Sequence, residues 1–76
     1  MKELIEYIAK SLASKPDEVT VTEISEEDGQ VVLRLECAED DKGKIIGRQG
    51  RVAQAMRVLL RVRAVKDDVR ASLEIV

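Results

Sequence analysis

The sequence predicts an α+β fold in which three helices cover one face of a three-stranded sheet. Two observations support this prediction. Apolar residues recur with the helical period of about 3.6 residues in some segments and with the strand period of 2 in others. In chain order the segments read helix, strand, strand, helix, helix, strand, which is the pattern of helices packed on a sheet.

The first expected helix covers about residues 3–14. Its apolar residues fall within one face of about 100° and should point to the core, while charged residues lie opposite. Pro16 disfavours helical geometry in the residue before it, so the helix should end by Lys15. The residues expected on the apolar face are Leu4, Ile5, Ile8 and Leu12.

Two strands should follow as an antiparallel hairpin with an Asp-Gly pair in its turn. Residues 19–24 are rich in β-branched side chains, but Ile24 breaks the alternation, which indicates a bulge or a fraying end. Residues 31–37 alternate apolar and polar side chains, and Cys37 belongs to the apolar set. We therefore interpret Cys37 as a packing residue rather than a reactive thiol.

Two helices and a final strand complete the chain. A short helix over residues 39–46 should have its carboxylates at the N-terminus, where backbone amides lack partners. A longer helix should begin at Arg51, with a buried face of Val52, Ala55, Met56, Leu59 and Val62 and a polar face of Gln54, Arg57 and Arg61. Val58 and Val65 should be partly exposed. The strand at residues 69–75 returns through a helical crossover and should lie parallel to the second strand.

The charges are divided unevenly along the chain. Residues 1–41 carry 4 basic and 12 acidic side chains, whereas residues 42–66 carry 8 basic and no acidic side chains. The last ten residues add 1 basic and 3 acidic side chains, which gives the net charge of -2. An acid-free run of 25 residues predicts an electropositive surface for a polyanion. A solvated basic helix face is the alternative.

Composition excludes several classes of protein. With no His and a single Cys, the chain has neither a zinc site nor a disulfide, and it lacks a His-based catalytic pair. We expect no enzyme, no cofactor, no small-molecule substrate and no membrane partner. The length predicts one domain, residues 1–76. No secretory apolar stretch follows Met1, so we expect a cytoplasmic protein.

The segment 44–51 is the most informative part of the chain. Gly47 and Gly50 stand between two expected helices, where a backbone without Cβ atoms lets a ligand reach the amides. The next helix adds its positive dipole end, and cations flank both glycines. This combination predicts a phosphodiester clamp, although an ordinary helix-turn-helix corner is the alternative. The candidate site residues are Lys44, Ile45, Ile46, Gly47, Arg48, Gln49, Gly50 and Arg51.

Two other glycine motifs are excluded by spacing. A nucleotide P-loop would end in Gly-Lys-Ser/Thr, and the dinucleotide fingerprint would need a glycine in place of Ile45.

IIGRQG between two helices, with the order α-β-β-α-α-β, resembles a KH domain of the type II (prokaryotic) topology over essentially the whole chain. A free-standing domain of this length resembles the KhpA (YlqC-like) family. The resemblance implies that residues 47–50 follow the backbone of about four nucleotides of single-stranded RNA. It places Ile45, Ile46 and Val52 near an aliphatic groove for bases, where periodicity alone would make them core residues.

The resemblance also implies partners and cellular roles. The family forms homodimers and pairs with a larger protein, KhpB (EloR or Jag), in post-transcriptional control, RNA chaperone activity, cell elongation and peptidoglycan homeostasis. We expect weak, salt-dependent binding, because the single aromatic residue, Tyr7, leaves little base stacking.

The main alternative is a protein-interaction module whose RNA contact is secondary. Duplex DNA binding by a helix-turn-helix is less favoured, because the longer helix has few base-reading side chains at its start. A double variant with aspartates at Gly47 and Gly50 should bind single-stranded RNA less tightly than wild type and leave the core intact. Whether Arg57 and Arg61 reach RNA depends on where the fold places them.

Overall fold

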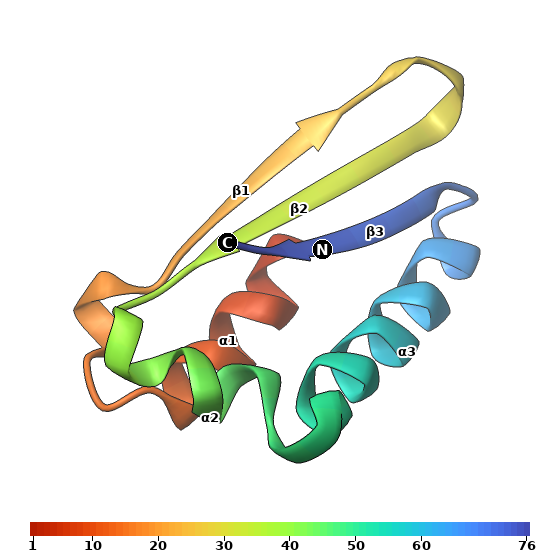
Figure 1. Ribbon diagram of the computed structural model, residues 1–76. Helices are drawn as coiled ribbons and strands as arrows, with labels where there is room; N and C mark the ends of the chain where they lie inside the picture. Colours follow the sequence, from red (N-terminus) through yellow and green to blue (C-terminus); the bar gives the residue numbers. More distant parts are fainter.

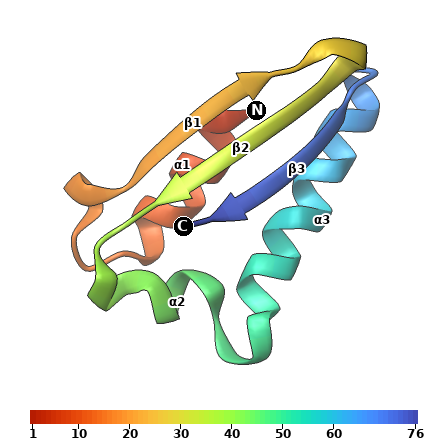
Figure 2. The ribbon, with the colours of Figure 1, turned by 45° about the horizontal axis from the view of Figure 1, so that its top comes forward.

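The computed structural model describes residues 1–76 and has the predicted order of helices and strands. The elements are α1 (Lys2–Leu12), β1 (Thr20–Ser25), β2 (Gln30–Glu36), α2 (Lys42–Ile46), α3 (Arg51–Lys66) and β3 (Arg70–Ile75). Figures 1 and 2 show α1 and α3 against the same face of the sheet, with α2 at one end of this helical layer. The fold class predicted from the sequence is therefore confirmed. No helix combines the length and the apolar composition that crossing a bilayer requires.

The sheet has the strand order β1-β2-β3. β1 pairs antiparallel with β2, and β3 pairs parallel with β2, as the hairpin and the helical crossover predicted. The expected irregularity at Ile24 is absent, because the register of β1 with β2 continues without interruption and Ile24 lies opposite Val32. Ile24 is an exposed apolar residue on the outer face of the sheet.

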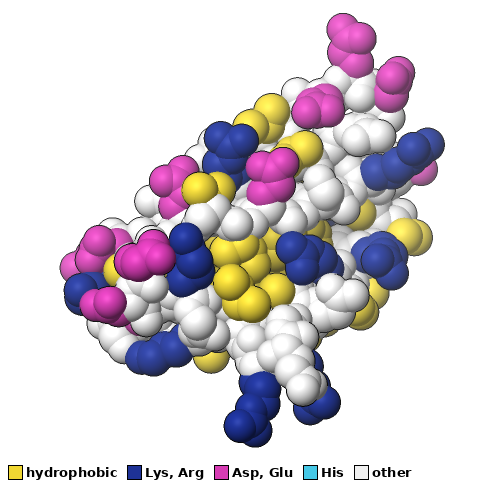
Figure 3. Space-filling model, viewed as in Figure 1, with side chains coloured by type: hydrophobic (Ala, Val, Ile, Leu, Met, Phe, Trp, Pro, Cys, Tyr) yellow, Lys and Arg dark blue, Asp and Glu magenta, His cyan; other side chains and the backbone are white.

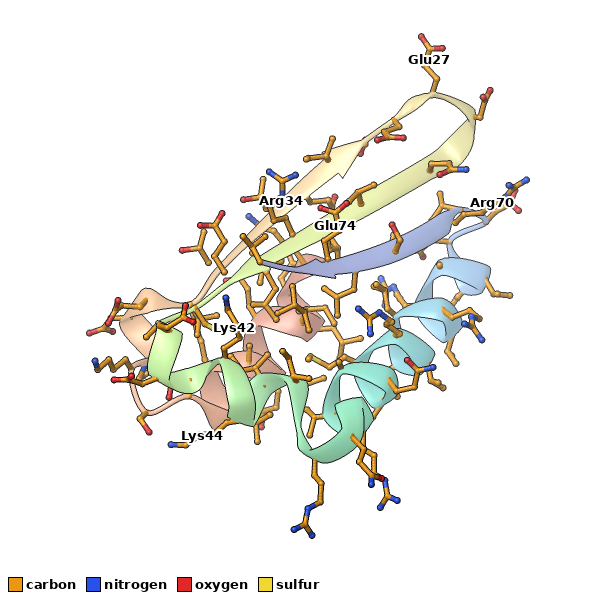
Figure 4. The ribbon with its side chains drawn as sticks, viewed as in Figure 1. Glu27, Arg34, Lys42, Lys44, Arg70 and Glu74 are labelled. Carbon is orange, nitrogen blue, oxygen red and sulfur yellow. The ribbon has the colours of Figure 1, made fainter.

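Apart from Ile24 and its partner Val32, the paired residues on the outer face of the sheet are polar. Arg34 of β2 and Glu74 of β3 lie opposite each other in the register, and their side chains pair at 3.4 Å (Figure 4). Such exposed pairs contribute little to stability, so this face is solvated surface.

The core lies between the sheet and the helices. The alternating residues Val31, Leu33 and Leu35 of β2 are buried as predicted, and α1 contributes Ile5 and Ala9. Leu12, expected in the core, is partly exposed, because α1 already ends at this residue.

Cys37 lies at the margin of this core. It is half-buried and packs against the core cluster. Burial raises the pKa of its thiol, with a smaller contribution from Asp41. Both observations agree with a packing residue, because the thiolate is the reactive form.

The buried face of α3 differs from the prediction. The buried residues are Ala53, Met56, Leu60 and Ala64, so most of the face lies one residue further along than expected, a rotation of about 100°. Leu59 and Val62, which were expected inside, are 48% and 65% exposed. The alanines occupy little space between helix and sheet, and α3 keeps a second apolar stripe on its outer side.

Candidate nucleic-acid interface

The turn between α2 and α3 has a backbone that requires glycine at its first position. Gly47 has φ 80° and ψ 168°, a region that only glycine enters readily. A Cβ atom added there would lie 2.8 Å from the backbone N and from the Cβ of Val52. Gln49 and Gly50 follow with left-handed φ angles of 58° and 73°, and a Cβ atom on Gly50 would meet nothing within 4 Å.

The two glycines therefore have different functions. Gly47 is needed for the packing of α3 against the turn, whereas Gly50 is needed for its backbone angle. This geometry corrects the expectation that aspartates at both positions leave the core intact, because any side chain at Gly47 collides with Val52.

The turn is exposed and positively charged. Arg48, Gln49 and Arg51 are exposed, and neither arginine forms an ion pair with a carboxylate. A guanidinium nitrogen of Arg51 donates to the Oε1 of Gln49 at 3.3 Å. Figure 3 shows Lys or Arg side chains projecting from this turn with no acidic side chain beside them.

The start of α3 adds a further positive feature. Gly50 occupies the N-cap position and supplies no side-chain cap for the first amides of the helix. These amides lack partners inside the helix, and the dipole of a helix is positive at this end. The amides of Gly50 and Arg51 donate to the carbonyl oxygens of Gly47 and Arg48. The turn therefore offers an anion two arginines beside the positive end of the helix dipole.

Lys44 has a different environment. Its Nζ donates to the Oγ of Ser14 and lies 3.9 Å from the Oδ1 of Asp41. Figure 4 shows Lys42 and Lys44 on opposite sides of α2. Lys42 pairs with Glu39 at 3.4 Å, so the charges of both lysines on α2 are at least partly compensated.

The two isoleucines before the turn are also placed differently. Ile45 is fully buried in the core cluster, so it supports the turn from beneath. Ile46 is half-buried at the surface. Of this pair, Ile46 is the residue with surface available to a ligand.

An apolar surface continues from the turn. Figure 3 shows apolar side chains between α2, α3 and the end of β3, bordered by Lys and Arg side chains. The half-buried apolar residues that these elements supply include Ile46, Val52 and Ile75. Further along, a hollow of about 210 Å³ opens between α3 and β3, and it is lined by Arg57, Leu60, Arg61, Ala71, Ser72 and Leu73.

Arg57 and Arg61 therefore face the open edge of the sheet. The guanidinium of Arg57 donates to the carbonyl oxygen of Leu73 at 3.3 Å, and neither arginine pairs with a carboxylate. The amide of Val76 donates to the carbonyl oxygen of Leu35 on β2. Because alternate residues of a strand point their backbone groups to opposite sides, Leu73 directs its N–H and C=O toward the free edge.

Both arginines were missing from the sequence-based list of site residues. Their spacing on a polar helix face was visible, but the surface they face depends on the position of β3.

The structure groups no three His, Cys, Asp or Glu side chains that could hold a metal ion.

Comparison with known proteins identifies the family. A family model described as "KhpA/KhpB, KH domain" matches residues 2–75. The chain belongs to this family. The KhpA/KhpB family of KH domains is not a family of enzymes, and its type II topology is the arrangement seen here.

Several KhpA relatives match along nearly their full length. The chain is 47% identical over 76 residues, all of both chains, to "RNA-binding protein KhpA" of Clostridium acetobutylicum. It is 47% identical to the protein of that name from Treponema pallidum, over 99% of this chain and 92% of the relative. It is 49% identical to the protein of that name from Borreliella burgdorferi, over 96% of this chain and 88% of the relative. No solved structure gave a significant match.

Proposed function

We propose that residues 1–76 act as a single KH domain that binds single-stranded RNA in the cytoplasm through the α2–α3 turn. One observation supports this most directly: the turn exposes backbone next to Arg48 and Arg51, neither of which has a carboxylate partner. The relatives are named RNA-binding proteins, which agrees with a phosphodiester ligand. The proposed site consists of Lys44 to Arg51, the segment that the sequence predicted. Within it, Ile45 is buried and supports the turn from beneath, and Lys44 is exposed but lies beside Asp41.

The RNA would follow α3 from the turn toward the hollow beside β3. Its phosphates would lie at the turn, where KH loops clamp about four nucleotides. Arg57 and Arg61 lie about 9 and 15 Å along the helix from Arg51, at a rise of 1.5 Å per residue. This distance fits a short single strand whose bases lie on the apolar surface between α3 and β3.

Binding should depend steeply on salt. The single aromatic residue, Tyr7, is on α1 and outside this surface, so stacking on aromatic rings does not contribute. Phosphate contacts on a single strand give a slope of about -0.7 per contact in a plot of log affinity against log salt. Two to four arginine contacts therefore predict a slope of about -1.4 to -2.8.

Gly50→Asp is the substitution that tests this function. It adds a carboxylate to the turn without a steric collision. Gly29→Asp is a matched control, because Gly29 has φ 71° in the β1–β2 turn and also has nothing within 4 Å of an added Cβ atom. In a filter-binding titration with short single-stranded RNA, Gly50→Asp should weaken binding by at least about tenfold, or 1.4 kcal/mol. Gly29→Asp should bind like wild type, and equal affinities for the two variants would contradict the proposal.

We propose in addition that two copies associate through the outer stripe of α3. This stripe consists of exposed apolar residues on the side opposite the core, namely Ala55, Val58, Leu59, Val62 and Val65. In an antiparallel pair with its two-fold axis near residue 60, Val58 of one copy lies opposite Val62 of the other. Arg51 then lies near Asp68 of the second copy, and neither residue has an ion-pair partner within its own chain.

Sedimentation of Val62→Glu tests this association. The substitution should shift the protein to a monomer, since it places a carboxylate from each copy against Val58 of the other copy, within the apolar stripe. Ile24→Glu is the control, because Ile24 is an exposed apolar residue on the outer face of the sheet. A wild-type protein that is already monomeric would contradict self-association and favour pairing with a KhpB-like protein instead.

The cellular roles in this proposal rest on family membership alone. They are RNA chaperone activity and post-transcriptional control, with a part in cell elongation and peptidoglycan homeostasis. The alternative function is a protein-interaction module whose RNA contact is secondary. The effect of salt concentration on binding distinguishes the two functions. Phosphate binding weakens steeply between about 50 and 200 mM salt, whereas association through an apolar protein interface does not.

A further inference from the structure

Asp41 is the one charged side chain that the fold buries, with 1% of its surface exposed. The sequence predicted that it would cap the short helix that follows. The structure corrects this, because no side chain caps α2. The two carboxylate oxygens of Asp41 instead accept hydrogen bonds from the backbone amides of Ser14 and Lys15, each at 2.9 Å.

Lys44 completes this arrangement from the next turn of the chain. Its Nζ donates to the Oγ of Ser14 and lies 3.9 Å from the Oδ1 of Asp41. The Asp41 clamp is the name used here for Asp41, Lys44, the hydroxyl of Ser14 and the amides of Ser14 and Lys15. It joins the segment after α1 to the start of α2. The two segments are 26 residues apart in sequence.

The Asp41 clamp fixes the position of α2, a helix that is too short to be stable in isolation. α2 has five residues and one buried side chain, Ile45, and helices this short are unstable in isolation. Its position therefore depends on Ile45, on the clamp at its start and on the contact of Gly47 with Val52 at its end. Because α2 ends directly at Gly47, any tilt of α2 moves the backbone amides of the turn.

We propose that Asp41 and Lys44 are positioning residues for the RNA-binding turn, and that Lys44 does not contact phosphate. This inference rests on the proposed RNA-binding function. Lys44 was selected from the sequence as one of three cations around the glycines. Of these three, Arg48 and Arg51 lack a carboxylate partner, whereas the charge of Lys44 is shared with Asp41 and Ser14.

The salt dependence of RNA binding distinguishes a phosphate ligand from a positioning residue. Arg48→Met should make the slope of log affinity against log salt shallower by about 0.7, the value for one phosphate contact on a single strand. Lys44→Met should lower the affinity about two- to fivefold and leave the slope unchanged. A shallower slope for Lys44→Met would show direct phosphate contact, and unchanged affinity would show that Lys44 positions nothing. Either result would overturn its assignment.

Asp41→Asn tests the carboxylate, with Asp40→Asn as the matched control. Asp40 is exposed and pairs only with the Nζ of Lys15, at 3.5 Å, so its variant changes the charge equally and spares the clamp. Measured well below both melting temperatures, Asp41→Asn should weaken RNA binding at least about fivefold and Asp40→Asn less than about twofold. In an NMR spectrum, Asp41→Asn should shift the amide signals of Gly47 and Gly50.

A residue with only a structural role would behave differently. It would lower the melting temperature, leave the affinity of the folded protein unchanged and leave the glycine signals in place, which would refute the proposal. If Asp41→Asn does not fold, Ser14→Ala removes the acceptor of Lys44 alone and should reproduce the effect of Lys44→Met. An affinity of Ser14→Ala equal to wild type would count against the clamp.

Failure of the clamp can be separated from failure of the proposed function. If Gly50→Asp and Arg48→Met bind RNA like wild type, the turn is not the RNA site. If these two variants lose affinity while the clamp variants do not, the RNA site stands and the inference about Asp41 and Lys44 is wrong.

Discussion

Alanine at Gly47 should destabilise the domain far more than alanine at Gly50. At Gly47 the backbone lies in a glycine-only region, which costs other residues about 1–3 kcal/mol. The collision with Val52 adds an overpacking cost of about 1–3 kcal/mol. The free energy of unfolding should therefore fall by about 2–6 kcal/mol for Gly47→Ala. At Gly50 only the left-handed φ opposes a side chain, at about 1–2 kcal/mol.

Thermal unfolding followed by circular dichroism measures this difference. In a domain of 60–100 residues, 1 kcal/mol shifts the melting temperature by about 4–8 °C. Gly47→Ala should therefore lower the melting temperature by at least about 8 °C, and Gly50→Ala by about 4–16 °C, with Gly47→Ala the less stable of the two. Equal melting temperatures for the two variants would refute the assignment of Gly47 to packing and Gly50 to backbone angle.

Two further predictions concern buried residues. The amides of Ser14 and Lys15 hold the pKa of Asp41 below its ordinary value of 3.8, so its stabilising effect is present above that value and is lost as pH falls through the lower, folded pKa. Urea unfolding at a series of acidic pH values should show a weaker pH dependence for Asp41→Asn than for wild type. In protein diluted until it is monomeric, Leu60→Ala should lower the free energy of unfolding by about 2–5 kcal/mol and Leu59→Ala by less than about 0.5 kcal/mol. The reverse order would support the helix face predicted from the sequence.

The elements and the turn were predictable because their signals are local. Two glycines three apart, a run of cations and the periods of the strands all lie within a few residues of each other. The parallel pairing of β3 also followed, since a strand that returns through a helical crossover has one favoured hand.

The buried face of α3 was not predictable in the same way. The helix has two apolar stripes, and the outer one contains larger side chains than Ala53 and Ala64 of the inner one. Hydrophobicity alone favoured the larger set. Only the narrow space between helix and sheet selects the small residues, and that space depends on the whole fold.

The hydrogen-bond partners of Asp41 and Arg57 were not predictable because they are distant in sequence. Asp41 binds amides 26 and 27 residues away, and Arg57 binds a carbonyl 16 residues away. Residues beside a predicted helix start look like caps, and residues on a polar stripe look solvated. Neither pattern contains the segment that the fold brings against it.

The open edge of β3 carries a risk for the protein. Unpaired strand edges can join edge to edge with other chains and start aggregation, and charged side chains are one of the means that prevent it. Arg57 donates a hydrogen bond to the carbonyl oxygen of Leu73, which points to the free edge, and Arg61 lines the same hollow. The same two cations that line the hollow therefore also oppose the addition of a further strand at the β3 edge.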